Sequence, residues 1–262
     1  MRGGNENRKL IGQYPYSKPN KILYTACNYV LLRLEKRIRL NNFMINTVQM
    51  FDERKQDMVI GGTDTSSNTI EFAMAEVMHN PEIMKRVQEE LEVVVGKDNV
   101  VEESHIHELP YLHAVMKETL RLHTALPLLV PHCPSQTTNV GGYTIPKGSR
   151  VFINVWAIHR DPSIWEKPLE FDPTRFLDAN WDFSGNDFNY FPFGSGRRIC
   201  AGIAMAERTV LYFVATLLHL FDWTIPQGEM LDTSEKFGIV LKKKTPLVAI
   251  PTPRLSHPEL YN

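Results

Sequence analysis

The chain has 262 residues, of which 43% are hydrophobic and 23% are charged, the usual balance of a globular protein. Its formal net charge of −1 gives no overall attraction to nucleic acid or to an anionic membrane, so no nucleic-acid partner is expected. The three cysteines, Cys27, Cys133 and Cys200, form no CxxC pair, which argues against a disulfide framework and a thiolate zinc site.

The start of the sequence has no signal-peptide pattern, and no apolar run long enough to cross a bilayer is expected anywhere in the chain. The apolar stretch that begins at Ile22 is interrupted by Asn28 and Arg33, which predicts a buried or surface helix. The basic residues that follow it could lie on an anionic membrane surface, although the solvated face of an ordinary helix is the simpler interpretation.

The first strongly periodic segment predicts a helix from about Asp57 to His79. Gly61 and Gly62 lie inside it, and each costs about 1 kcal/mol relative to alanine in a helix interior. Two adjacent glycines at such a place need a reason other than helix stability.

Two further helices are predicted downstream of this segment. Asn80 is expected to cap, and Pro81 to begin, the helix PEIMKRVQEELEVVV, which Gly96 ends. A third helix runs through LPYLHAVMKETLRLH at residues 109–123.

The second half of the chain mixes strands, irregular segments and one more helix. YTIPKGSRVFINVWA predicts a hairpin, because apolar residues alternate on either side of a turn at residues 146–148, and residues 158–192 look irregular. The helix after Gly202 is apolar nearly all round in its later part and should be buried on every side. KFGIVLKKKTPLVAIP predicts two strands around a turn at residues 242–245, which makes the protein mainly helical with a small β component.

One short stretch, FPFGSGRRICAG at residues 191–202, points to chemistry. Cys200 would lie at the first turn of the apolar helix, where unpaired N–H groups favour a thiolate that could act as a nucleophile or a metal ligand. No Cys/His signature of a nucleophilic enzyme accompanies it, and Ile199 stands where a GxGxxG phosphate loop needs its third glycine. A buried inert cysteine would leave the flanking glycines unexplained, whereas a flat, bulky group would need them to approach the backbone.

The same stretch matches the pattern FxxGxRxCxG and resembles the haem-binding loop of the cytochrome P450 superfamily. In sequence it is most similar to the plant microsomal members. The resemblance implies haem b, with the Cys200 thiolate as the iron ligand and Arg198 paired with a haem propionate. It also implies that Phe193 packs beside the sulfur and that Gly196 and Gly202 leave room for the porphyrin.

Two motifs that precede this loop occur in the order found in the family. ETLR supplies Glu118 and Arg121, which on their own would be an ordinary ion pair at i and i+3 of a helix, and FDPTRF supplies Arg175. The resemblance implies that these three side chains form a buried network that holds the irregular segment against the cysteine region.

The paired glycines belong to a third motif, GGTDTS at residues 61–66, which resembles the distal helix signature of the family. There, small residues such as Gly61 widen the groove over the iron, and an acid and a hydroxyl relay protons to bound oxygen. Asp64 and Thr65 would have these roles. Taken alone, the stretch could equally be a Ser/Thr-rich helix start with an incidental acid.

Apolar segments of the chain match two regions of the family that contact the substrate. The first contains Leu126, Leu128 and Val130, and the second contains Ile239, so a lipophilic substrate is implied. His132, in LLVPHCP, matches a position that reaches a haem propionate, although a lone histidine is often a structural hydrogen-bonding residue.

The resemblance covers residues 57–254 as a partial haem-thiolate monooxygenase domain, leaving residues 1–56 unmatched and residues 255–262 as a tail. The implied fold is the C-terminal half of the cytochrome P450 fold, from the distal helix to the haem-binding loop and the helix after it. The implied activity is insertion of one atom of O2 into a lipophilic small molecule. Electrons would come from NADPH through a flavoprotein reductase.

The family is expected on the cytosolic face of the endoplasmic reticulum, and the sequence shows no anchor of its own. The alternative hypothesis is a non-catalytic fragment with no productive haem binding, since exposed apolar surfaces favour aggregation or partner binding.

Overall fold

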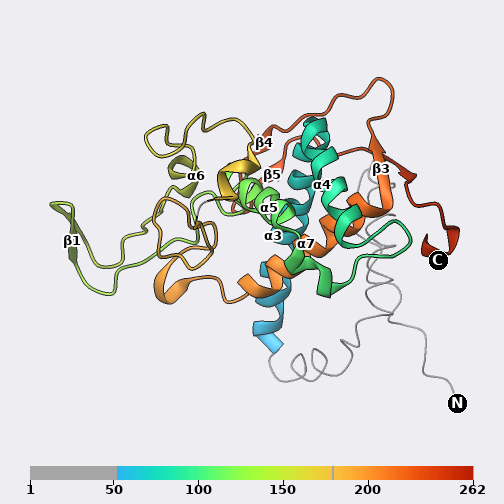
Figure 1. Cartoon of the computed structure of the whole chain (residues 1–262). Helices are drawn as coiled ribbons and strands as arrows, with labels where there is room; N and C mark the ends of the chain where they lie inside the picture. Colours follow the sequence, from blue (N-terminus) through green and yellow to red (C-terminus); the bar gives the residue numbers. More distant parts are fainter. Residues whose placement is uncertain (1–51, 179, 262) are drawn as a thin grey trace, which may run out of the picture.

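The structure is a computed structural model that describes residues 52–178 and 180–261, with side chains described from Gly61 onward. Four helices cross one another to form its centre (Figure 1): α3 (Asp52–His79), α4 (Pro81–Val94), α5 (Pro110–Leu122) and α7 (Ile203–Leu220). The helix expected near residues 22–39, and Cys27, lie outside the described residues.

The helix α3 begins five residues before the predicted start and ends at the predicted residue, His79. Polar side chains in its middle bond back to carbonyl oxygens one turn earlier: Thr65 Oγ1 donates to Gly61 O (2.6 Å) and Thr69 Oγ1 donates to Thr65 O (2.8 Å). Such back-bonding slightly destabilises and often bends a helix. The later part of α3 is buried, with Met74 and Val77 fully enclosed.

The helix α4 starts with Pro81 at its first position and is followed by Gly96 at φ +81°, as the sequence predicts. Asn80 occupies the predicted N-cap position, but its side chain does not cap α4. Asn80 Nδ2 donates to Glu76 O (2.8 Å) at the end of α3, so this side chain closes the preceding helix and makes no capping bond to α4. A short 3₁₀ helix, η2 (Glu103–Glu108), then leads to α5.

The later part of the helix α7 is buried, as predicted. Its residues from Val210 to Leu220 are almost all buried, whereas Met205 near its start is 61% exposed. By length and composition α7 could cross a membrane, yet more than half of that window is buried within the fold, as in the core helix of a globular protein.

The predicted hairpin has a different partner and turn. The strand β2 (Tyr143–Ile145) pairs with β1 (Thr138–Val140), which precedes it, around Gly141 and Gly142 at φ +55° and +83°. Paired glycines suit such a tight turn because they adopt positive φ without strain. Val151 pairs instead with His132, and Asn154 caps the short helix α6 (Val155–Ile158).

The C-terminal strands also differ from the prediction. The strand β4 (Glu235–Lys236) pairs with β5 (Lys242–Lys243), so the turn lies at residues 237–241 and the lysines are in a strand. The last strand, β6 (Ile250–Pro253), pairs with β3 (Phe221–Thr224) after α7. The lysine run looked like a turn because of its charge, but Lys243 is only 5% exposed and its ammonium group donates to Asp232 O.

Residues 158–192 are irregular, as predicted, and enclose an aromatic core. Tyr190 is fully buried, its hydroxyl donates to Lys117 O (2.9 Å), and four Trp and Phe rings lie around it besides the His159 ring. These are Trp165, Phe176, Trp181 and Phe183. The segment includes the 3₁₀ turn η3 (Pro173–Phe176), which packs on α5.

Candidate functional site

The loop at residues 191–202 is folded by its own backbone. Gly194 N donates to Phe191 O and Cys200 N donates to Phe193 O, both at 3.0 Å, while Gly194 and Gly196 have φ of +80° and +66°. Only glycine takes such φ values freely, so these residues let the chain reverse direction before Cys200.

The thiol of Cys200 is exposed at the start of α7. Gly202 N lies 3.4 Å from Cys200 Sγ and donates toward it, and the first helical residue, Ile203, follows directly. An N–H group and the positive end of a helix both stabilise negative charge on sulfur. A methyl group added at Gly196 would meet no atom within 4 Å, so the space beside the loop is open. An exposed sulfur with open space beside it fits a thiolate ligand to a large planar group.

Phe193 is partly buried and contacts Phe183 edge to face, with ring centroids 5.0 Å apart. Arg198 and His132 are exposed, and within the described residues neither side chain makes an ion pair or a hydrogen bond. His132 is held only through its backbone, which pairs with Val151 at 2.8 Å in both directions. Both side chains are therefore available to an anionic group.

The carboxylate of Glu118 is fully buried and surrounded by donors. Arg121 donates to it through Nε (2.6 Å) and Nη2 (2.8 Å), Asp172 N donates to Oε1 (2.9 Å), and Arg175 Nε lies 3.4 Å from Oε1. Burial raises the pKa of Glu118, and the hydrogen bonds and charge of Arg121 oppose this effect. The structure thus brings together the three residues of the predicted network.

The same arginines hold the irregular segment by its carbonyl oxygens. Arg121 Nη1 donates to His159 O (2.7 Å) and Pro168 O (2.8 Å), while Arg175 Nη2 donates to Lys167 O (3.1 Å). Buried carbonyl groups need such partners. Removing one charge of such a pair strands the other, which typically costs about 3–5 kcal/mol.

His159, which no sequence motif indicated, links this network to the Cys200 loop. Phe191 N donates to His159 Nε2 (3.1 Å), so this nitrogen is unprotonated and the other, Nδ1, carries the hydrogen toward Thr124 Oγ1 (3.0 Å). Burial and the charges of Arg121 and Arg160 lower the pKa of His159 from 6.5 to about 3. It lies in a stretch without periodicity or motif, so no sequence signal indicated its role.

The distal part of α3 is open on one side. Gly61 and Gly62 are exposed, and a methyl group at either would meet nothing within 4 Å. Thr65 donates its hydroxyl hydrogen to Gly61 O, which leaves the oxygen as an acceptor. Asp64 pairs with Lys242 of β5 (3.1 Å), and both side chains are about half exposed; sequence reasoning gave no sign of this partner.

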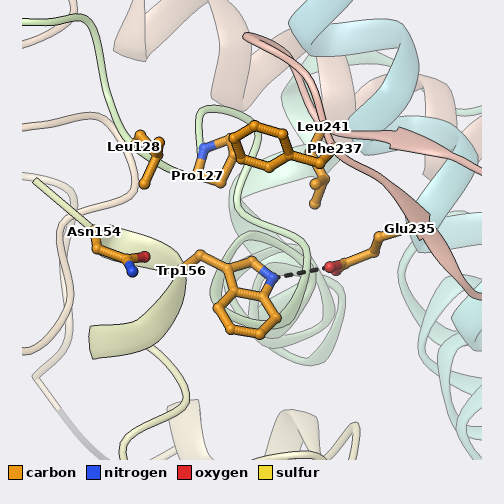
Figure 2. A pocket seen from close by; sticks show the side chains of 7 residues that line it. All are labelled: Pro127, Leu128, Asn154, Trp156, Glu235, Phe237 and Leu241. Atoms are coloured by element: carbon orange, nitrogen blue, oxygen red, sulfur yellow. Dashed lines mark hydrogen bonds between the residues drawn. The ribbon is translucent and has the colours of Figure 1, made fainter. Parts of the chain in front are cut away.

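A cavity of about 280 Å³ lies where the two predicted substrate segments meet (Figure 2). Leu128 lies on one side of it, Phe237 and Leu241 on another, and Trp156 donates its indole hydrogen to Glu235 (2.8 Å) across the opening. The other predicted substrate residues do not line it: Leu126 is partly buried, and Val130 and Ile239 are 64% and 84% exposed. Pro127 and Asn154 complete the lining.

Comparison with known proteins matches this chain to one family. Residues 40–250 match the family model described as Cytochrome P450. The chain is 47% identical over 209 residues to Cytochrome P450 98A1 of Sorghum bicolor, which aligns with 79% of this chain and 41% of that protein. It is 50% identical over 198 residues to carnosic acid synthase of Rosmarinus officinalis, over 74% of this chain and 39% of that protein.

Solved structures agree with the sequence matches. A zebra fish cytochrome P450 described with progesterone superposes with a TM-score of 0.67 at 36% identity, covering 76% of this chain and 44% of that one. The chain therefore spans about two fifths of the curated relatives that it matches and less than half of the solved structure. The predicted fold class, a mainly helical part of this fold with a small β component, is confirmed.

Proposed function

Because the chain belongs to the cytochrome P450 family, we propose that it carries the iron-ligand side and the distal helix of a haem-thiolate monooxygenase. Haem b bound there would supply the iron at which O2 is activated for insertion of one oxygen atom into a substrate. The observation that carries the proposal is the exposed Cys200 sulfur, which receives the Gly202 N–H at the start of α7.

Each residue near the loop has a role in holding such a group. Cys200 would bind the iron as a thiolate, and Gly202 N–H would stabilise the negative charge on sulfur. Arg198 and His132 would donate to the haem carboxylates, and Phe193 would exclude water from one side of the sulfur. The network of Glu118, Arg121 and Arg175 would keep the loop in place. These assignments are supported by exposure, free donors and the buried network described above.

On the distal side, Asp64 and Thr65 would hold and pass protons. The Thr65 oxygen can accept a hydrogen bond because its own hydrogen is directed to Gly61 O. The Asp64 carboxylate lies at the surface beside Lys242, where water can reach it. Gly61 leaves the groove beside Thr65 open.

The substrate class and partners follow from the same site. The walls formed by Leu128, Phe237 and Leu241 favour a lipophilic small molecule, with Leu126, Val130 and Ile239 as further apolar surface. Electrons would come from NADPH through a flavoprotein reductase, and the enzyme would act on the cytosolic face of the endoplasmic reticulum. The second candidate, a non-catalytic fragment, is favoured by the exposure of Val130 and Ile239, which nothing in the described chain covers.

One spectrum distinguishes the two. The purified 262-residue chain is mixed with haem, reduced and exposed to carbon monoxide. A strongly red-shifted Soret band, lost in Cys200→Ser but kept in Cys133→Ser, is the expected result. The cysteine at 133 is the matched control, since it is also exposed. Identical spectra for the wild type and Cys200→Ser would reject thiolate ligation by this chain and favour the second candidate.

A further inference from the structure

A second buried charge cluster lies away from the Glu118 network, around His123 at the end of α5. The His123 side chain is only 5% exposed. Its Nε2 lies 2.9 Å from Glu76 Oε1 of α3, and its Nδ1 lies 2.7 Å from Glu235 Oε1 of β4. The ring stacks on Phe72 with centroids 4.1 Å apart and planes 8° apart, so its orientation is fixed.

The two contacts determine the charge of the ring. An ionised carboxylate only accepts hydrogen bonds, so each nitrogen of His123 must donate, and a ring with two N–H groups is an imidazolium.

Glu235 is held from three directions. Besides His123, Arg160 Nη2 donates to its Oε1 (2.7 Å), and Trp156 Nε1 donates to its Oε2 (2.8 Å). Burial alone would raise the pKa of Glu235, but the hydrogen bond from His123 and the charge of Arg160 lower it. This carboxylate is therefore ionised at neutral pH.

The charges of the cluster balance only when His123 is charged. Its two carboxylates, Glu76 and Glu235, then face two cations, the imidazolium and Arg160. Lys243 of β5 lies nearby with its ammonium group 5.8 Å from the Phe72 ring, and the carboxylates of Glu71, Asp232 and Glu76 all act on its charge. A neutral ring would leave Glu76 without a hydrogen-bonded cation, which is unfavourable for a buried carboxylate.

The cluster fixes one wall of the cavity in Figure 2. Glu235 begins the segment 235–241, which contributes Phe237 and Leu241 to the wall. At the other end of this segment, Leu241 N donates to Ala125 O (2.8 Å), two residues after His123. Both ends of the segment 235–241 therefore contact the chain that leaves α5, at His123 and at Ala125. Of these two contacts, the one with His123 is between charged groups.

We infer that His123 is a positioning residue, held as an imidazolium between Glu76 and Glu235, that keeps the segment 235–241 in place as a wall of the substrate cavity. That the wall faces a substrate rests on the proposed function. The charge state of the ring and the docking of the segment do not.

Two variants separate charge balance from packing. His123→Gln removes the cation and leaves two facing carboxylates. The double variant Glu76→Gln with His123→Gln removes one negative charge as well and restores the balance. Hydrogen exchange at the Leu241 amide reports docking of the wall, and the Arg254 amide, which donates to Leu220 O between β6 and β3, is the control.

We expect exchange at Leu241 to be about tenfold faster in His123→Gln and close to the wild-type rate in the double variant, with Arg254 unchanged. Unchanged exchange in His123→Gln, or a double variant no better than the single one, would overturn the inference.

The wild-type chain gives a test that needs no stable variant. The ¹⁵N resonances of the His123 ring should show two protonated nitrogens at pH 7, and one unprotonated nitrogen would contradict the assigned charge. Neither measurement uses haem. A chain that fails the carbon monoxide experiment can still pass both, so failure of the proposed function and failure of this inference are distinguishable.

Discussion

The Cys200 loop and the distal part of α3 would face the same haem, yet the fold supports them in different ways. The loop is tied to α5 through fully buried groups, Glu118, Arg121 and His159. Asp64 of the distal segment is tied to β5 by an ion pair whose two side chains are half exposed. Buried hydrogen-bonded networks rigidify a site, whereas exposed pairs contribute about 0–1 kcal/mol. We infer that buried contacts among the described residues hold the Cys200 loop in place. The distal segment, with only an exposed ion pair at Asp64, would need further contacts to be held as firmly.

The largest expected effect comes from breaking the buried network. Arg121→Met should lower the free energy of unfolding by about 3–5 kcal/mol, because it leaves the Glu118 carboxylate charged and buried and frees the carbonyl groups of His159 and Pro168. Urea unfolding followed by circular dichroism measures this. Lys85→Met removes the exposed pair with Glu89 and is the control, with a change below about 0.5 kcal/mol. Equal effects of the two substitutions would contradict the claim that the buried network contributes more stability than an exposed ion pair.

The next effect is a pH dependence caused by His159. The folded state holds this ring neutral with a pKa of about 3, while the unfolded chain takes up a proton near 6.5, so stability is present above pH 6.5 and is lost as the pH falls toward 3. Between pH 7 and pH 5 this amounts to about 2 kcal/mol.

The measurement is urea unfolding at both pH values for the wild type and His159→Gln. We expect the variant to lose about 2 kcal/mol less than the wild type over this interval. His219 also has a lowered pKa, caused by burial, but it is present in both proteins and cancels in the difference. Parallel pH profiles would show that His159 is not neutral in the fold.

A smaller effect is expected in the loop itself. Gly196→Ala places a side chain at φ +66°, which should destabilise the fold by about 1 kcal/mol without any clash, since a methyl group there meets nothing within 4 Å. Gly148→Ala, at φ +82° in an exposed turn and also free of contacts, is the matched control. Both should cost a similar amount in urea unfolding, but only Gly196→Ala should weaken haem binding in a Soret titration. Unchanged haem affinity would mean that the loop is not the binding site.

The smallest effect on stability is expected on the distal side. Asp64→Asn should change the unfolding free energy by less than about 1 kcal/mol, because the lost partner, Lys242, is half exposed. Arg208→Met, which breaks the exposed pair with Glu103, should have an effect of similar size in the same assay. A loss of several kcal/mol in Asp64→Asn alone would show that the distal segment is as firmly built as the loop.

The sequence predicted the helices well because their signals are local. Pro81, Gly96 and the apolar periodicity of α4 and α5 all act within a few residues. The residues of the Glu118 network were found through motifs, and their burial could not be read from spacing alone. Strand pairing was predicted wrongly, since Tyr143 could pair with either neighbouring segment, and the glycine turn at residues 141–142 decided between them.

The contacts that sequence reasoning missed join residues far apart in the chain. His159 reaches Phe191 across 32 positions, and His123 joins Glu76 to Glu235 across most of the described chain. His123 ends the predicted helix at residues 109–123 and His159 lies in the irregular segment, and neither position indicates which partner the ring contacts. Only the packing of α3, α5 and the irregular segment places these rings beside their partners.

The central claim is that the buried network orders the Cys200 loop before haem binds. Native-state hydrogen exchange on the haem-free chain tests it directly, by comparing the amides of Phe191 and Cys200, which donate to His159 and Phe193, with those of residues 61–66. We expect the loop amides to exchange about a hundredfold more slowly than the distal ones. Loop amides that exchange as fast as the distal ones would contradict it.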